Sequence, residues 1–124
     1  MQTKLVHQHK SIAPPAGVEV WDVDPYDEAI LMDPVPFFTE LRSKGEFVYI
    51  PRYQILACGR YDQTREVFYD HNRFLSSRGV GMADFKLEEP WRPPSIVLEV
   101  DPPVHTHNRR VILRALSPAV VRKL

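Results

Sequence analysis

The run Asp101-Pro102-Pro103 restricts the fold of the last part of the chain, because it is a strong helix start. An aspartate side chain accepts hydrogen bonds from the free amides of a first helical turn, and proline suits early positions that need no intrahelical N–H. Side chains then recur at steps of three and four residues, at Val104, Asn108, Val111, Ile112, Ala115 and Leu116. The pattern predicts a helix from residue 102 onward whose apolar stripe, broken only by Asn108, lies against a core.

His105 and Arg109 lie four residues apart, beside this stripe. Two donor side chains one helical turn apart can bind a single carboxylate or phosphate. They are equally typical of the partly solvated edge of an amphipathic helix, and spacing alone favours that ordinary interpretation. The spacing therefore leaves both interpretations open.

The same segment is locally basic. From residue 102 to the end the chain has no Asp or Glu, although the whole chain balances 16 acidic against 16 basic residues. The basic residues of the segment are Arg109, Arg110, Arg114, Arg122 and Lys123. Such a surface suits an acidic partner. It also leaves open a non-catalytic anion-binding or nucleic-acid-binding module, against which the neutral net charge and the lack of a nucleic-acid motif argue.

The middle of the chain predicts a helix and a hairpin. Asp33 and Pro34 can begin a helix over residues 33–44, which Gly45 can end. Two runs rich in β-forming residues, 47–50 and 54–58, are separated by Pro51-Arg52-Tyr53. This arrangement predicts a two-stranded antiparallel ribbon.

A further helix is expected directly after the ribbon. Asp62 can cap it, and it is expected to continue to about residue 70. Val67 and Phe68 are its apolar residues, and both are expected to be buried. The last helix of the chain is expected to begin at Ser117-Pro118, where a capping residue precedes a proline.

Three motifs follow one another in a definite order. They are Asp33-Pro34 with Phe37-Phe38-x-x-Leu41-Arg42, then Arg60-Tyr61-Asp62 after the two strands, then Asp101-Pro102-Pro103-x-His105-x-x-x-Arg109-Arg110 followed by Leu113 and Ser117-Pro118. Their order and spacing, over residues 24–124, resemble the N-terminal part of the soluble bacterial cytochrome P450 family of haem-thiolate monooxygenases. Two further runs, Ser76-Ser77-Arg78-Gly79-Val80-Gly81 and Pro90-Trp91-Arg92-Pro93-Pro94-Ser95, are similar to the subgroup that oxidises para-substituted benzoates such as methoxybenzoate.

The resemblance implies a mainly α fold with a small β-hairpin, an incomplete N-terminal portion of the cytochrome P450 fold with helices A, B and C and the first sheet strands. Residues 1–23 would be a leader, and residues 24–124 part of a domain that continues beyond Leu124. The implied cofactor is haem b, with His105 and Arg109 binding its propionates. Arg110 and Arg114 would lie on the face that receives electrons from a 2Fe-2S ferredoxin, itself reduced by an NAD(P)H-dependent reductase.

The segment 76–100 is expected to be an ordered irregular loop, because glycines lie near its start and prolines near its end. The resemblance places this loop along the substrate pocket. Arg92 and Ser95 would then bind the carboxylate of a small aromatic acid, with Leu98 packing on the ring. The alternative is a surface Arg92 that stacks on Trp91, which the residues alone favour.

Cys58 is the only cysteine, and it is not expected to be the haem ligand. The family's ligand lies in a glycine-rich loop that this chain lacks, so Cys58 is expected to be a small buried hydrophobe and the ligand to lie outside this chain. The segment alone is therefore expected to be inactive, whereas the full-length enzyme would hydroxylate or O-demethylate its substrate. A haem-binding family member with another activity remains an alternative.

The N-terminal residues bear on location. Residues 1–20 hold no apolar run of signal or membrane-span length. The sequence therefore predicts a cytoplasmic protein that does not contact a membrane. We also expect no nucleic-acid partner and no metal site formed by this chain. The full-length protein is expected to be a monomer.

Overall fold

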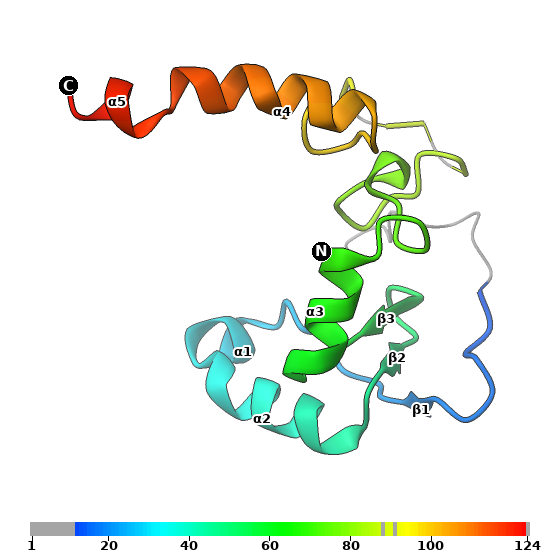
Figure 1. Ribbon diagram of the computed structural model, residues 1–124. Coiled ribbons are helices and arrows are strands. Elements are labelled where there is room, and N and C mark those ends of the chain that lie inside the picture. Colours follow the sequence, from blue (N-terminus) through cyan, green and yellow to red (C-terminus); the bar gives the residue numbers. More distant parts are fainter. Residues whose placement is uncertain (1–11, 88, 91, 124) are drawn as a thin grey trace. The chain divides into compact units, whose positions relative to one another are not determined.

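The protein divides into two units, Met1–Asp70 and His71–Leu124, each with its own secondary structure (Figure 1). The structure is a computed structural model that describes residues 12–87, 89, 90 and 92–123. Residues 1–11 of the predicted leader, Glu88, Trp91 and Leu124 lie outside the described residues. Helices predominate beside one small three-stranded sheet, so the predicted class is confirmed at this level.

The sheet of the first unit has the strand order β1-β2-β3. Strands β2 (Val48–Ile50) and β3 (Ile55–Ala57) pair antiparallel, with Tyr49 opposite Leu56, which confirms the predicted ribbon. Strand β1 (Glu19–Val20) pairs parallel with β2 and was not predicted, because two residues carry no readable alternation. Both residues of β1 fall within the segment 1–23 that was expected to be a leader.

Two helices precede the ribbon. Helix α1 (Glu28–Met32) was not predicted; it is capped by Asp27, whose carboxylate accepts from the Ala29 amide at 2.9 Å. Helix α2 (Pro34–Lys44) has the predicted extent, with proline in its first turn and Gly45 after it at a φ of 152°, a conformation that favours glycine. The predicted side-chain cap by Asp33 is wrong, because this residue ends α1 and its carboxylate makes no capping bond to α2.

The core of the first unit lies around β2. The buried apolar residues of the described chain are Leu41, Val48, Tyr49 and Ile50. Trp21, next to β1, stacks on Phe37 of α2 with ring centroids 5.1 Å apart. The central strand β2 is thus paired along both edges, and all three of its residues are buried.

Helix α3 (Tyr61–Tyr69) follows the ribbon where predicted, but two details of the prediction are wrong. The N-cap is Arg60 and not Asp62, which lies in the first turn. The Phe68 side chain is 82% exposed, whereas Val67 is half-buried. Consecutive residues point about 100° apart around a helix, so the two side chains cannot share one inward direction.

The second unit holds a short 3-10 helix η1 (Ser76–Arg78), helix α4 (Val104–Ala115) and helix α5 (Pro118–Val121). Helix α5 begins at the predicted Ser117-Pro118. Helix α4 begins two residues later than predicted, because a residue that precedes proline is disfavoured in helical conformation and this applies to both Asp101 and Pro102. The expected burial of its apolar stripe is also wrong for this chain, since no described residue of α4 is buried.

Candidate functional site

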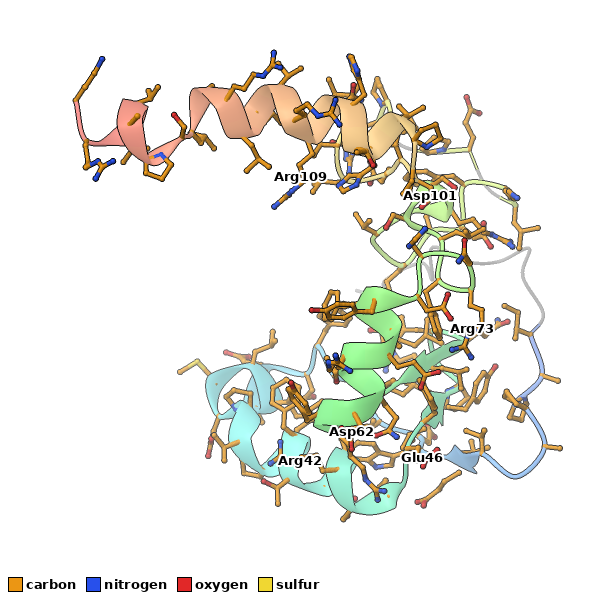
Figure 2. All side chains as sticks on the ribbon, in the orientation of Figure 1. Arg42, Glu46, Asp62, Arg73, Asp101 and Arg109 are labelled. Carbon is orange, nitrogen blue, oxygen red and sulfur yellow. The ribbon has the colours of Figure 1, made fainter. Side chains whose placement is uncertain are left out.

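Asp101 joins η1 to the start of α4 (Figure 2). Its Oδ1 accepts from the Ser76 amide at 2.9 Å, and its Oδ2 from the Ser77 amide at 3.3 Å. The predicted capping role is therefore wrong: the carboxylate is occupied by amides 24 and 25 residues away, and the N-cap of α4 is Pro103. Hydrogen bonding from the Ser77 side chain, with the two amides, holds the pKa of Asp101 below its ordinary value.

A second carboxylate closes the turn after η1. Arg78 donates two hydrogen bonds to Asp84, one from Nε to Oδ1 at 3.0 Å and one from Nη2 to Oδ2. Asp84 also accepts from the Lys86 amide at 3.0 Å, and Phe85 donates its amide to the Arg78 carbonyl at 2.8 Å. The predicted ordered irregular loop is thus tied internally by a bidentate ion pair.

A third carboxylate, Glu99, lies inside the loop, and its residue exposure is only 4%. Arg92 donates to it from Nη1 at 2.9 Å and from Nη2 at 2.6 Å, and the Ser95 amide donates at 2.6 Å. These donors, with Arg92 first, hold the pKa of Glu99 below its ordinary value. Arg92 and Ser95, which were predicted to bind a substrate carboxylate, therefore converge on a carboxylate of the chain itself.

Ser95 also organises the turn that leads to Glu99. Its Oγ accepts from the Val97 amide at 3.2 Å and from the Leu98 amide at 3.1 Å. Both lone pairs are then used, and the hydroxyl hydrogen is left as a donor. The Leu98 side chain is 60% exposed, so it is accessible to an apolar ligand. Trp91, the proposed stacking partner of Arg92, lies outside the described residues.

Helix α4 presents the predicted pair His105 and Arg109 one turn apart, with His105 half-buried and Arg109 exposed. Figure 2 shows Arg109 on this helix. Neither side chain has a hydrogen-bond or ion-pair partner among the described residues. Asn108, on the same helix, donates its Nδ2 to the Ile96 carbonyl at 2.5 Å, which fastens α4 to the loop of Arg92 and Glu99. The structure thus presents two unengaged donor side chains on a helix anchored to that loop.

Arg110 and Arg114, predicted to face an electron donor, are both exposed on α4. Arg114 lies in the last turn of the helix, where a positive charge interacts favourably with the helix dipole. The described residues of α4 contain no acidic side chain. Both arginines are therefore accessible on this helix, and their role toward an electron donor stays a prediction.

Cys58 follows β3, and its thiol lies 3.9 Å from the Thr64 hydroxyl. It is half-buried and not fully buried as expected, and it lies just after β3, which is an edge strand of the sheet. Within the described ranges, no group of three or more His, Cys, Asp or Glu side chains could hold a metal ion. The same ranges contain no helix with the length and apolarity needed to cross a membrane.

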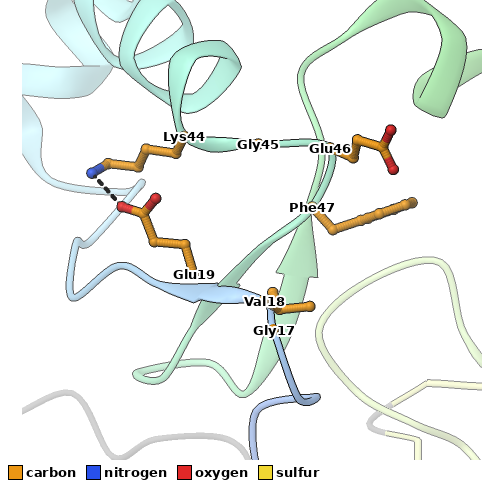
Figure 3. A pocket seen from close by; sticks show the side chains of 7 residues that line it. All are labelled: Gly17, Val18, Glu19, Lys44, Gly45, Glu46 and Phe47. Atoms are coloured by element: carbon orange, nitrogen blue, oxygen red, sulfur yellow. Dashed lines mark hydrogen bonds and ion pairs between the residues drawn. The ribbon is translucent and has the colours of Figure 1, made fainter.

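A depression of about 640 Å³ lies on the first unit, lined by residues 17–19 and 44–47 (Figure 3). Its lysine, Lys44, binds Glu19 at 3.0 Å and Glu40 at 3.3 Å, and its ammonium group lies over the Trp21 ring. The hydrogen bond that Lys44 donates to the Glu19 carboxylate raises the pKa of Lys44. The charge of Lys44 is therefore already compensated within the unit.

No protein-family model matches the chain. The chain is 44% identical over 109 residues, 88% of its length, to cytochrome P450 CYP199A2 of Rhodopseudomonas palustris. It is 33% identical over 105 residues, 85% of its length, to the beta-dihydromenaquinone-9 omega-hydroxylase of Mycobacterium tuberculosis, and 28% identical over 91 residues, 73% of its length, to cytochrome P450 109 of Bacillus spizizenii. The chain belongs to the cytochrome P450 family. It spans 26%, 19% and 20%, respectively, of the length of these three relatives.

Family membership implies a haem cofactor. The residues of α4 fit the periphery of such a group, because His105 and Arg109 are unengaged donors at a spacing that suits one anionic substituent. The described part of the chain offers no cysteine in a glycine-rich ligand loop, since Cys58 follows a strand of the ribbon. The described residues therefore include donors that suit an anionic group, but no cysteine placed as in the family's haem-ligand loop.

Sequence reasoning missed Glu99 and Asp84. Each accepts from an arginine six or seven residues away, across an irregular loop that has no periodic pattern. A local signal did exist in Ser95 and Glu99, four residues apart, where a serine can organise a turn. Nothing in the sequence showed that this turn also buries the carboxylate.

Proposed function

We propose that the protein containing this chain is a haem-thiolate monooxygenase that hydroxylates or O-demethylates a small aromatic carboxylic acid, such as a para-substituted benzoate, with O2 and electrons from a 2Fe-2S ferredoxin. The observation that carries the proposal is the unengaged pair His105 and Arg109 on α4, in a chain 44% identical over 109 residues to cytochrome P450 CYP199A2. The bound haem supplies the site of oxygen reduction and substrate oxidation. This chain supplies helices A, B and C of the fold, proposed to be α2, α3 and α4.

His105 and Arg109 bind the haem propionates in this proposal. A propionate that enters a protein loses water, and donors that carry charge compensate this loss better than neutral donors. The two side chains extend from successive turns of one helix, so they approach the same carboxylate together. Hydrogen bonds of Asn108 and Asp101 hold α4 against the preceding loop, so the positions of His105 and Arg109 are fixed relative to that loop.

The loop around Arg92 binds the substrate in this proposal. Arg92 carries the positive charge, and the Ser95 hydroxyl, whose lone pairs are used by two amides, remains a donor for an anionic group. Leu98 is exposed beside them and can pack on an aromatic ring. An aromatic acid needs hydrogen-bond donors for its carboxylate and an apolar side chain for its ring, and these three residues offer both.

Arg110 and Arg114 form the electron-donor surface in this proposal. Their exposure on a helix free of acidic side chains supports the docking of a small acidic ferredoxin, reduced in turn by an NAD(P)H-dependent reductase. Exposed charges act mainly on the association rate and orientation of a partner, so this docking is expected to weaken with salt. A cytoplasmic monomer would suit such transient encounters.

The experiment that tests the proposed function uses the full-length protein. A reduced carbon-monoxide difference spectrum is expected to show the red-shifted Soret band of a thiolate-ligated haem. Titration with 4-methoxybenzoate and with its methyl ester is then expected to show tighter binding of the acid, a preference that Arg92→Ala removes. Absence of the thiolate band, or an equal loss for acid and ester in the variant, would contradict the corresponding part of the proposal.

A matched pair of variants tests the propionate contact. Arg109→Ala is expected to accelerate haem transfer to apomyoglobin, because one charge-assisted contact is lost. Arg122→Ala removes the same charge from the C-cap of α5, where the Arg122 side chain donates to the Pro118 carbonyl at 3.1 Å, and is expected to leave haem transfer unchanged. Equal rates for the two variants would contradict the propionate role.

A further inference from the structure

Glu99 is the one charged side chain that is buried among the described residues, and it has no part in the chemistry proposed above. Its side-chain exposure is 1%, against 35% for Arg92. The carboxylate accepts from both terminal nitrogens of the guanidinium and from the Ser95 amide. A buried carboxylate with three donors is a strongly specified feature, because losing any donor leaves charge without compensation.

We propose that Glu99 is a positioning residue that orients Arg92 and Ser95 toward the carboxylate of the substrate. The inference rests on the proposed function and deepens it. By holding two nitrogens of the guanidinium, Glu99 fixes the plane in which Arg92 presents its charge. By accepting from the Ser95 amide, it also fixes the turn from which the Ser95 hydroxyl extends.

The geometry distinguishes a positioning role from simple competition for Arg92. A substrate carboxylate that displaced Glu99 would strand a buried negative charge without its donors, which is strongly unfavourable. Glu99 therefore stays in place, and the substrate joins the existing cluster from the exposed side of Arg92. Orientation of the donors, and not an excess of positive charge, then sets the preference for an acid.

The Ser95 turn reinforces this arrangement. Glu99 donates its own amide to the Ser95 carbonyl at 3.3 Å, while the Ser95 hydroxyl accepts from the Val97 and Leu98 amides. The same turn brings Leu98 to the surface beside Ser95. One buried carboxylate thus determines the placement of a cationic, a hydroxyl and an apolar contact for an aromatic acid.

The test is Glu99→Gln in the full-length haem protein, with dissociation constants for 4-methoxybenzoate and its methyl ester measured from the Soret shift. The amide keeps the shape of the side chain, but it cannot accept both arginine contacts, because one of its two atoms is a donor. The acid is expected to bind about tenfold more weakly, as for the loss of one charge-assisted hydrogen bond. The ester is expected to change by less than about twofold.

Asp84→Asn is the matched control. It removes the other bidentate arginine partner of the same loop, so a general loosening of the loop would appear in both variants. This control is expected to change acid and ester binding equally. Glu99→Asp is the second variant: it keeps the buried charge, so it retains the fold, but retracts the carboxylate by one methylene and is expected to lose part of the acid preference.

The outcomes separate the inference from the proposed function. If the unmodified protein binds acid and ester equally, the proposed substrate class is wrong and the inference fails with it. If the unmodified protein prefers the acid and both Glu99 variants keep the full preference, the positioning role is overturned while the proposed function stands. Tighter acid binding by Glu99→Gln would also overturn it, because Glu99 would then compete with the substrate.

Discussion

Replacing Asp101 with alanine should open the junction between η1 and α4. Asp101 accepts from the Ser76 amide at 2.9 Å and from the Ser77 amide at 3.3 Å, and alanine removes both acceptors. The first distance lies in the normal range for N–H···O bonds and the second at its long end, so the first contributes more. Ser76 and Ser77 then lose the hydrogen bonds that connect them to the start of α4.

The size of the effect follows from these two bonds. A hydrogen bond to a charged group contributes about 1.5–3 kcal/mol to stability. Because Asp101 is only half-buried, we take the lower end of this range for the bond to Ser76 and a smaller contribution for the longer bond to Ser77. The sum is about 2 kcal/mol, which corresponds to about a 30-fold increase in the opening equilibrium of the two amides. Glu99 and its partners are expected to be less affected, because they lie within a separate turn.

Native-state hydrogen exchange of the full-length protein, followed by mass spectrometry of peptides covering residues 71–80, measures this opening directly. Asp27→Ala is the matched control, since Asp27 accepts from the Ala29 amide at 2.9 Å in the other unit. It should accelerate exchange at α1 and leave Ser76 and Ser77 unchanged. Exchange of these two amides at the unmodified rate in Asp101→Ala would refute the reasoning.

Three further predictions concern stability. Ile50→Ala should lower the free energy of unfolding by about 2–5 kcal/mol in urea denaturation, because the side chain is 1% exposed in β2. Gly79→Ala should cost at least about 1–2 kcal/mol in the same assay, because φ is 110° and an added Cβ would overlap the Ala83 carbonyl. Acidification should release the loop, which is measured as a loss of near-ultraviolet circular dichroism. The pKa of Glu99 is lower in the folded chain than in the unfolded chain, so the ionised carboxylate stabilises the fold above the unfolded pKa of about 4. This stabilisation is lost as the pH falls through the lower folded pKa.

Each of these predictions has a control that could contradict it. Leu56→Ala, on the neighbouring strand and 49% exposed, should cost much less than Ile50→Ala, and equal losses would place the core elsewhere. Gly81→Ala meets no atom within 4 Å and should be tolerated. Glu99→Gln should shift the pH at which near-ultraviolet circular dichroism is lost. An unchanged midpoint would mean that other carboxylates cause the transition.

Local chemistry was sufficient for several elements. Pro34 and Gly45 delimit α2 because proline lacks the amide that a first turn does not use and glycine adopts the conformation that follows the helix. The ribbon was equally predictable, since two β-rich runs flank a turn with the Gln54 amide donating to the Pro51 carbonyl. The family followed from the order of motifs and is confirmed by its relatives.

Side-chain partners were not predictable in the same way. Asp101 has the ideal residue type and position for a cap, yet its carboxylate binds amides 24 and 25 residues earlier. The prediction that Arg92 and Ser95 bind a substrate carboxylate remains a proposal, and the structure adds the internal carboxylate of Glu99 to them. An aspartate that caps a helix and an aspartate that binds distant amides look the same in the local sequence. Which of the two roles it takes depends on which distant segment approaches it in the fold.

The sequence by itself therefore determined the extent of α2, the β2–β3 ribbon, the start of α5, the basic character of α4, the His105–Arg109 spacing and the family. The tertiary structure alone decided which charges are engaged. It placed Glu99 inside the loop, left the two donors of α4 without partners in the described chain, and exposed Phe68. The physical reason is that backbone conformation depends on neighbours within a few residues, whereas burial and ion pairing depend on which distant segments fold against each other.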